Sequence, residues 1–284
     1  MVQELLIVEL RTSLEFVFPV KEQEISILEQ YNEVNWTFIG SQNRRNKNLK
    51  FENTEVWGFE HALRGMRNPK NSWDRSDSFN CLDKEGEHCS KFCKNYNTEK
   101  CFMYGNYRLK TPFVIGDNDM KLAQNLIKAG GEHSKFMRMI HVSVDVDMPR
   151  YWWSEADTYH FNTKNSCSTM HKLLDNDNLI TKDLFVWCEE DEDIVGAVVN
   201  RLESLRQEYK NPTYSTDKNR LLVRAKRLLM EGFLQMRTWD TNYAELRNMY
   251  FQRRHHRLKE EWVDIFCRWV ESLPYAEELI MYEG

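Results

Sequence analysis

No stretch of the sequence approaches the ~18 consecutive apolar residues of a membrane-spanning helix, so we expect no transmembrane segment. Glycine (11) and proline (6) are scarce among the 284 residues and aromatic residues reach 13%, which excludes collagen-like and disordered chains. Basic residues have no surplus, because 39 Lys and Arg face 44 Asp and Glu, a net charge of −5. This balance does not favour nucleic acid as a partner. The composition instead favours a globular protein with an aromatic core.

Common catalytic and nucleotide-binding motifs are also missing. There is no G-x-G-x-x-G, G-x-x-x-x-G-K, H-E-x-x-H or G-x-S-x-G, which removes the signatures of Rossmann domains, P-loops, zincins and α/β-hydrolases. The N-terminus carries Glu4 and Glu9 where a signal peptide has basic residues. We therefore expect a cytoplasmic protein with reduced cysteines, and its catalytic residues remain unknown.

Hydrophobic periodicity predicts a mixture of strands and helices. Residues 140–148 alternate apolar and polar side chains, which is typical of a half-buried strand. Asp117 or Asn118 is an expected helix cap, and Asn242 with Glu245 has capping-box spacing. Further strands are expected at 5–8 and 14–20, and helices at 54–67, 117–129, 194–210, 217–234 and 242–273, with a short one opened by Pro149.

Four of the seven cysteines lie in the polar stretch 70–110, at Cys81, Cys89, Cys93 and Cys101. Four thiolates can complete the tetrahedral shell of a zinc ion. Only Cys89 and Cys93 have the short spacing that structural zinc sites usually show. The stretch is therefore interpreted either as a zinc site or as an exposed loop with free thiols.

Two other regions gather polar chemistry. Residues 155–171, after the 140–148 strand, combine acids, amides, hydroxyls, histidines and Cys167, which suits a ligand pocket, although an ordinary polar connection is the alternative. Residues 253–257 read Arg-Arg-His-His-Arg and span more than one helical turn. They cannot all face one ligand, so part of this run is expected to face solvent.

Together these two regions resemble the flavin-dependent thymidylate synthases, whose signature is Q-x-x-R-H-R-x-x-S-x-N-E-x-S-x-R just after a strand. Without gaps, the signature glutamine falls on Glu155 and the R-H-R on 158–160. Its N-E falls on Asn165 and Ser166, its second serine on Ser168 and its last arginine on Met170. Asn165 and Ser168 are identical to the signature.

A second match lies toward the C-terminus. The family has a helix end resembling A-R-x-x-L-P, followed by N-x-R-x-L-x-x-F-x-x-x-R. Ala225 and Lys226 open the first piece, and the second retains Asn242, Leu246 and Arg253, with no gap over 225–253. The resemblance covers 117–172 and 221–275.

The resemblance implies an α+β fold, a twisted sheet with packed helices and a helix-rich C-terminal half. It implies a single domain over 1–284, within which 70–110 is a cysteine-containing insertion or loop. The family assembles as homotetramers, binds FAD at subunit interfaces, and transfers a one-carbon unit from methylenetetrahydrofolate to C5 of dUMP with NADPH as reductant. By resemblance this chain is a flavoprotein of nucleotide biosynthesis, a divergent methyl- or hydroxymethyltransferase acting on a uracil nucleotide.

The resemblance also implies roles for individual residues. Cofactor-binding residues would be Asn242, Asn248, His160 and Asn165, and substrate-binding residues would be Arg253, Ser168, Lys226 and Glu155. Arginine offers a planar fork of donors for carbonyl or phosphate oxygens, and lysine keeps that charge without the bidentate geometry. Asparagine supplies both a donor and an acceptor for a ring edge.

Departures from the signature keep two alternatives open. Two arginines of the signature are replaced by Thr158 and Met170, and its histidine is replaced by Tyr159. Each arginine lost removes charge-assisted hydrogen bonds to a phosphate, which are worth about 1.5–3 kcal/mol each. One alternative is therefore a catalytically inactive nucleotide-binding or interaction protein on the same fold. The other is a metal-bearing protein associated with nucleic acid, which rests on the cysteine stretch and the Arg/His run.

Overall fold

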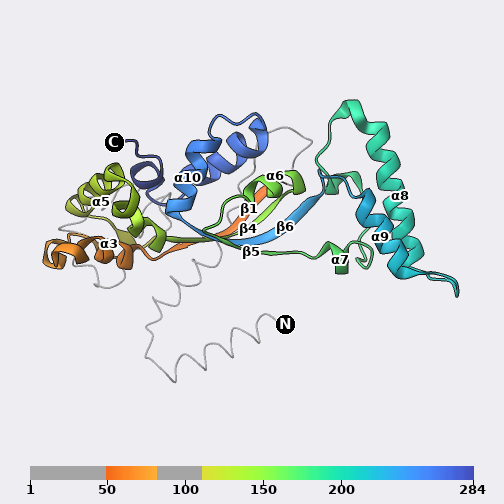
Figure 1. Ribbon diagram of the computed structural model, residues 1–284, viewed down its shortest axis with the longest axis horizontal. Helices are drawn as coiled ribbons and strands as arrows, with labels where there is room; N and C mark the ends of the chain where they lie inside the picture. The colour runs from red at the N-terminus through yellow and green to blue at the C-terminus, as the bar shows by residue number, and fades with distance from the viewer. Residues whose placement is uncertain (1–48, 82–110) are drawn as a thin grey trace, which may run out of the picture. The chain divides into compact units, whose positions relative to one another are not determined.

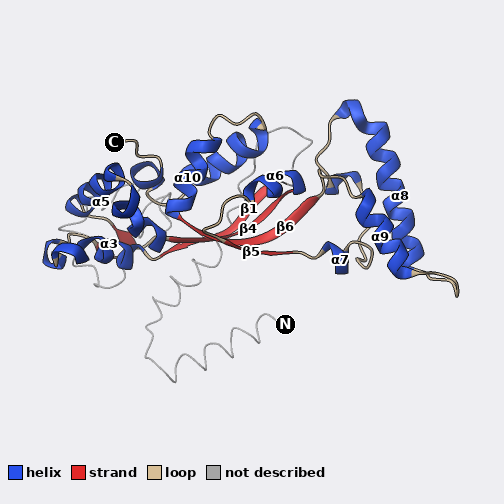
Figure 2. Ribbon diagram, viewed as in Figure 1, coloured by secondary structure: helices blue, strands red, loops and turns tan. Residues whose placement is uncertain are grey.

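The structure, a computed structural model, describes residues 49–81 and 111–284, all within one compact unit, Thr37–Gly284. Figure 1 shows the order of the elements along the chain, and Figure 2 separates helices from strands. The strands are β1 Lys50–Trp57, β2 Phe79–Asn80, β3 Phe113–Val114, β4 His141–Pro149, β5 Thr163–Ser166 and β6 Leu234–Asn242. The α-helices are α3 Phe59–Arg67, α5 Asp117–Ala129, α6 Arg150–Ala156, α7 Thr169–Lys172, α8 Glu192–Lys210, α9 Lys218–Leu228, α10 Tyr243–Arg253 and α11 Arg268–Glu271. The 3₁₀-helices are η1 Asn68–Lys70, η2 Trp73–Arg75, η3 Gly131–Met139, η4 Lys182–Leu184 and η5 Glu189–Asp191. The π-helices are η6 Lys259–Cys267 and η7 Ala276–Ile280.

Four strands form one antiparallel sheet in the order β1-β4-β6-β5, while β2 and β3 pair separately. The alternation predicted at 140–148 is confirmed, because Val142, Val144 and Val146 are buried on one face of β4. Helices α6 and α10 lie over this face (Figure 1), and the polar residues of β4 occupy the opposite face. The fold is therefore a mixed α and β architecture with an antiparallel sheet, as the α+β expectation states.

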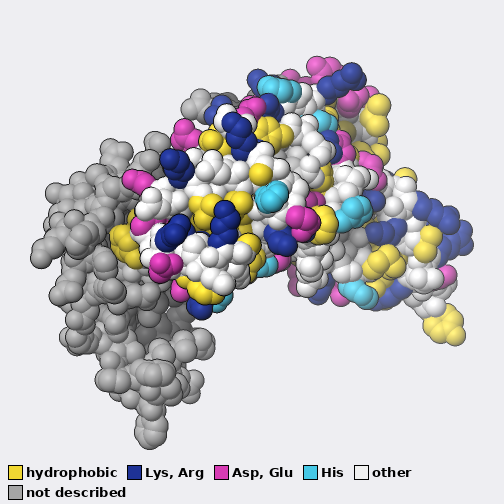
Figure 3. Space-filling view, turned by 60° about the vertical axis from the view of Figure 1, so that its left-hand side comes forward, with side chains coloured by type: hydrophobic (Ala, Val, Ile, Leu, Met, Phe, Trp, Pro, Cys, Tyr) yellow, Lys and Arg dark blue, Asp and Glu magenta, His cyan; other side chains and the backbone are white. Residues whose placement is uncertain are grey.

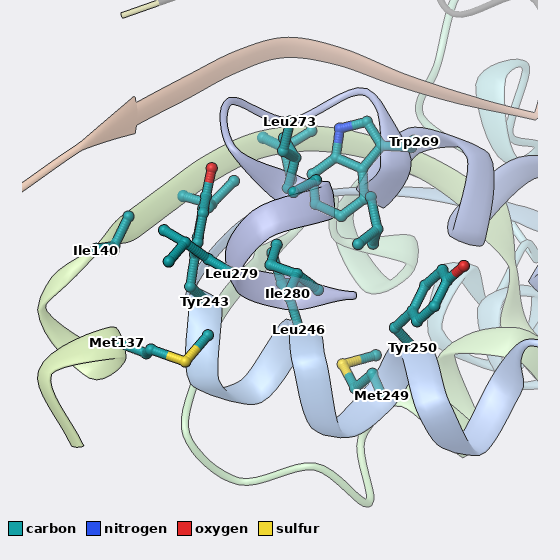
Figure 4. Close-up of a cluster of buried hydrophobic side chains, with 14 of the residues drawn as sticks. Met137, Ile140, Tyr243, Leu246, Met249, Tyr250, Trp269, Leu273, Leu279 and Ile280 are labelled. Carbon is teal, nitrogen blue, oxygen red and sulfur yellow. The ribbon is translucent and has the colours of Figure 1, made fainter. Parts of the chain in front are cut away.

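Helix α10 carries much of the main core. Tyr243, Leu246 and Met249 recur at helical spacing and are fully buried. Figure 4 shows them packed with side chains of η7 and of the segment around α11. The Tyr243 hydroxyl also donates a 2.5 Å hydrogen bond to the carbonyl of Pro274, which ties α10 to the C-terminal segment.

Four tryptophans fill the space between α6, β6 and η6. Trp152, Trp153, Trp239 and Trp262 are all fully buried. The ring of Trp152 lies 4.7 Å from that of Trp262 and 6.3 Å from that of Trp239, measured between centroids. Aromatic side chains bury large areas, so this cluster forms a large part of the core between these elements.

A smaller core holds α8 against α9. Leu202 and Leu205 of α8 pack with Leu221 and Ala225 of α9, and all four are buried. The helix predicted from 194 is confirmed, with its bounds at Glu192–Lys210. No helix among the described residues is long and apolar enough to cross a membrane.

The helix predicted at 54–67 is partly wrong, because 54–57 belong to β1. The cross-strand pairs Val56–Val142 and Trp57–His141 place these residues in the sheet. Gly58 then turns the chain with a φ of +93°, and a Cβ there would stand 2.1 Å from the carbonyl oxygen of Met139. Only glycine tolerates this combination, so the helix begins at Phe59.

Two C-terminal predictions also need correction. The helix predicted at 217–234 ends at Leu228, and β6 follows from Leu234, a strand that periodicity did not reveal. The helix predicted at 242–273 is interrupted after Arg253. The ring nitrogen Nδ1 of His256 accepts the backbone N–H of Leu258 at 3.2 Å, which removes the donor that a continuing α-helix would use.

The start of α5 uses a cap from elsewhere in the chain. Its N-cap is Gly116 rather than Asp117 or Asn118, and the carboxylate of Asp77 accepts the N–H groups of Asn118 (2.8 Å) and Asp119 (3.1 Å). Asn242, by contrast, caps α10 as predicted by accepting the N–H of Glu245 at 3.0 Å. The strands predicted at 5–8 and 14–20 lie outside the described residues.

Candidate functional site

Arg253, the last residue of α10, lies at the centre of a polar cluster. Its Nη1 donates to Glu155 Oε2 of α6 at 2.5 Å, and its Nε donates to the hydroxyl of Tyr159 at 2.9 Å. The guanidinium also lies over the ring of Trp262, 4.4 Å from the centroid. A carboxylate, a phenol and an aromatic face therefore hold the arginine from three elements, with its side chain 15% exposed.

His256 completes this cluster from the turn after α10. Its Nε2 lies 2.9 Å from Arg253 Nη1 and 3.3 Å from Glu155 Oε2. Because Nδ1 accepts the N–H of Leu258, the neutral ring carries its proton on Nε2, facing Glu155. Glu155 thus has two donors, and it can fix the orientation of both.

A chain of hydrogen bonds runs from Arg253 along the surface of α10. The Tyr159 hydroxyl donates to Gln252 Oε1 at 3.0 Å, and Gln252 Nε2 donates to Asn248 Oδ1 at 2.7 Å. Asn248 is exposed at the end of this chain. The structure therefore brings together Glu155 and Arg253, expected at the nucleotide, and Asn248, expected at the flavin.

Asn242, the other expected flavin residue, has its amide held within the chain. Its Oδ1 caps α10 and its Nδ2 donates to the carbonyl of Phe161 at 3.1 Å. The ring of Phe161 is 61% exposed, and the guanidinium of Arg138 lies over it at 5.2 Å. Sequence analysis did not single out Arg138 or Phe161, since an aromatic in a polar loop and an arginine near a helix end are common features.

Lys226 and Ser168 lie on adjacent elements. Lys226 Nζ donates to the Thr169 hydroxyl at 2.5 Å, and Ser168 Oγ caps α7 by accepting the N–H of His171 at 3.3 Å. Burial, followed by the positive charge of Arg150, lowers the pKa of Lys226. The structure thus leaves positive charge beside the two hydroxyls, a combination that suits an anionic group.

Asn165 lies on the edge strand β5 and His160 in the turn before it, next to β6, the strand that ends at Asn242. Asn165 pairs with Thr238 across β5 and β6, and it is exposed. His160 is exposed in the turn before β5. Neither is buried within the Arg253 cluster, so these two residues form the outer part of the candidate site.

A second charged cluster, missed from the sequence, lies beside the signature positions. Arg237 of β6 donates to both carboxylate oxygens of Asp157 at 3.0 and 3.1 Å and stacks over Trp153 at 4.4 Å. Lys164 Nζ lies 3.4 Å from the same carboxylate, and burial lowers its pKa. Two cations therefore share the carboxylate of Asp157, the residue before the position where the signature's R-H-R begins. The sequence does not predict this cluster, because the pairing of β5 with β6 brings Lys164 and Arg237 together.

The predicted zinc ligands cannot be placed together. Cys81 is described and partly buried, whereas Cys89, Cys93 and Cys101 lie outside the described residues. Among the residues that the structure describes, no group of three His, Cys, Asp or Glu side chains could hold a metal ion. Burial raises the pKa of Cys267 to about 12, so this thiol is inert as a nucleophile at neutral pH.

Comparison with known proteins shows a likeness in structure but not in sequence. No family model matches this chain, and no curated protein matches its sequence. Two crystal structures of the flavin-dependent thymidylate synthase ThyX from Helicobacter pylori, each with FAD and dUMP, are similar to it in fold. One has a TM-score of 0.54 at 15% identity, covering 81% of this chain and 95% of the other. The second has a TM-score of 0.53 at 13% identity, covering 81% and 97%.

Proposed function

We propose that this chain is a divergent flavin-dependent enzyme that transfers a methyl or hydroxymethyl group to C5 of a uracil nucleotide such as dUMP. The observation that carries the proposal is the hydrogen-bonded chain from Glu155 through Arg253, Tyr159 and Gln252 to Asn248. It joins residues that the family resemblance assigns to the nucleotide with one assigned to the flavin. The solved neighbours, crystallised with FAD and dUMP on the same fold, support the same pair of ligands.

In this proposal Arg253 binds the pyrimidine and Glu155 orients it. The guanidinium has five N–H donors, and the contacts with Glu155 and Tyr159 leave others for a carbonyl oxygen of the base. Lys226 and Ser168 bind the phosphate, with Arg150 adding positive potential. Binding the base at one cluster and the phosphate at the other orients C5 of the nucleotide.

The exposed residues of the candidate site carry the types of side chain that bind a flavin. Asn248 and Asn165 offer donors and acceptors for a ring edge, the exposed ring of Phe161 offers a stacking surface, and Arg138 and His160 offer charge or donors for a pyrophosphate. Bound FAD would supply the hydride, with NADPH as reductant and methylenetetrahydrofolate as one-carbon donor. The protein's own contribution is to orient these groups.

A nucleotide-binding protein without catalysis is the second candidate. Tyr159, at the centre of the signature's R-H-R, is 7% exposed and bonded to Arg253 and Gln252. It therefore supports α10 instead of facing a ligand, and Thr158 beside it carries no charge. On this fold such a site could retain the nucleotide while flavin chemistry is lost.

Flavin retention and product formation separate these candidates. The purified chain, loaded with FAD and passed through a desalting column, is expected to keep the visible absorbance of flavin. Asn248→Ala should lose that absorbance, whereas Asn125→Ala, an exposed asparagine of α5, should keep it. Thymidylate or its hydroxymethyl analogue formed from dUMP, methylenetetrahydrofolate and NADPH supports the enzyme, and dUMP binding without flavin or product supports the second candidate.

A further inference from the structure

Helix α9 presents a stripe of arginines on the side away from its core. Arg220, Arg224 and Arg227 follow i, i+4, i+7 spacing, which places them on one face of the helix. The buried residues Leu221 and Ala225 each lie about 100° further around the helix than the arginine before them, and they pack in the core shared with α8. Figure 3 shows Lys and Arg side chains gathered at the end of the molecule formed by α8 and α9.

The positive charge of this stripe is not neutralised. Among the described residues, none of the three arginines has an ion-pair partner, whereas on α8 Arg206 pairs with Glu203 and Lys210 with Asp177. Unpaired cations at this density repel one another and attract an anion. The even overall balance of charge therefore conceals a local surplus on one helix.

Further cations lie on another side of α9 and on the neighbouring helix α7. Lys226 reaches the Thr169 hydroxyl, Lys172 is exposed at the end of α7, and Arg150 adds charge close enough to lower the pKa of Lys226. A linear polyanion crossing this surface would meet cations over a longer path than the stripe alone provides. A single small anion would leave most of them unpaired.

Exposed apolar side chains lie beside the arginines, and an exposed aromatic residue precedes α9. Val223 and Leu228 flank the stripe and are each more than a third exposed. Tyr214, in the connection between α8 and α9, has its ring fully in solvent. Proteins that bind single strands combine backbone-tracking cations with side chains on which bases stack.

We propose that the α9 stripe, Arg220, Arg224 and Arg227 together with Tyr214, binds single-stranded nucleic acid. The arginines contact successive phosphates, and Tyr214 stacks on a base. Binding is independent of sequence, because phosphate contacts and stacking carry no base-edge recognition. The proposal does not depend on flavin or one-carbon chemistry, since none of these four residues belongs to the candidate site.

Fluorescence anisotropy with a labelled oligothymidylate tests the proposal on the full chain. Three phosphate contacts to a single strand give a logarithmic salt slope of about −2, so raising the salt fourfold should weaken binding about 20-fold. Arg220→Ala, Arg224→Ala and Arg227→Ala combined should abolish most binding and flatten this slope. Tyr214→Ala should weaken binding about tenfold with the slope unchanged.

A matched control removes the same charge elsewhere. Arg64→Ala, Lys121→Ala and Lys128→Ala combined change three exposed cations of α3 and α5 and should leave binding within twofold of the unmodified chain. Circular dichroism melts of both triple variants establish that they are folded. Equal losses in the two triple variants would overturn the proposal, because they would indicate a general charge effect. Binding of polyglutamate or of phosphatidylserine vesicles to the stripe, without binding of the oligonucleotide, would also overturn it.

Discussion

At the scale of single residues, the ion pair between Glu155 and Arg253 has the greatest consequence for function. The signature that the chain resembles has a neutral glutamine where this chain has Glu155, so a carboxylate stands in place of an amide next to Arg253. The pair holds the guanidinium in place and occupies one of its N–H groups. Replacing Arg253 therefore tests whether this cluster binds a nucleotide or only stabilises the fold.

Arg253→Ala is expected to weaken dUMP binding by tenfold or more while the protein remains folded, because the lost bonds are charge-assisted. Arg254→Ala is the matched control, since Arg254 lies about 100° further around the helix and pairs with Glu283 in solvent. Isothermal titration with dUMP compares the two variants. If both bind dUMP equally well, Arg253 has no part in nucleotide recognition.

Asp147, on the polar face of β4, makes the stability of the protein depend on pH. Burial is the main cause that raises its pKa to about 6, opposed by the charge of Lys50, and its Oδ1 is buried without a hydrogen-bond partner among the described residues. Between about pH 4 and pH 6 the folded state therefore binds more protons than the unfolded state. Consequently this carboxyl makes the free energy of unfolding fall as the pH rises through that window.

Asp147→Asn should raise the free energy of unfolding at pH 7 by about 1–2 kcal/mol and flatten its decline between pH 4 and 6. Urea unfolding at several pH values measures both effects. Asp145→Asn is the control, because Asp145 accepts hydrogen bonds from Asn53 and Thr238 and gains nothing from neutralisation. A variant at 147 that is less stable at pH 7 than the unmodified chain would contradict this account.

At the scale of elements, glycines decide where β1 ends and where α5 stops. Gly58 and Gly130 both have positive φ, at +93° and +68°. They differ in their surroundings, because a Cβ at 58 would collide with the carbonyl of Met139, whereas nothing lies within 4 Å of one at 130. Backbone conformation alone therefore calls for glycine at 130, whereas at 58 a steric clash is added to an unfavourable backbone conformation.

Gly130→Ala is expected to cost about 1–3 kcal/mol, because its φ of +68° with ψ of −171° lies in a region almost confined to glycine. Gly58→Ala should cost more, because alanine there has a left-handed conformation and η3 must also move away from β1. Thermal unfolding of the two variants, with Ala123→Gly in α5 as a reference for helix propensity, measures the difference. Gly58→Ala that destabilises the protein no more than Gly130→Ala would contradict the importance of the contact with Met139.

At the scale of the whole molecule, assembly and cofactor binding are expected to be coupled. The family resemblance implies a homotetramer in which more than one subunit completes each flavin site, and closed dihedral symmetry is a common way to build one. The polar edge of the sheet around Asn165, His160 and Phe161 is exposed in the single chain. We propose that this edge meets a second copy when the flavin binds.

FAD should therefore raise both the melting temperature and the fraction of tetramer. A ligand that binds only the folded state stabilises it by about 2.7 kcal/mol at a hundredfold excess over Kd. Differential scanning fluorimetry and sedimentation velocity, with and without FAD, measure the two effects. Asn248→Ala should remove both without changing the melting temperature of the free protein, because Asn248 is exposed. A monomer that responds to neither FAD nor dUMP would exclude the flavoenzyme.

Local patterns in the sequence predicted several elements of this protein correctly. The alternation at 140–148, the apolar face of α8 and the Asn242 cap of α10 depend on neighbours only a few residues away, so they are legible without the fold. The end of β1 and the whole of β6 were not, because strand pairing joins residues that are far apart in the chain. The candidate site likewise has residues that the sequence identified and residues that only long-range packing brought to it. The family resemblance pointed to Arg253, Asn248 and Glu155. Tyr159 and Gln252, which connect them, and Arg237 with Lys164, which share Asp157, were brought together only by tertiary packing.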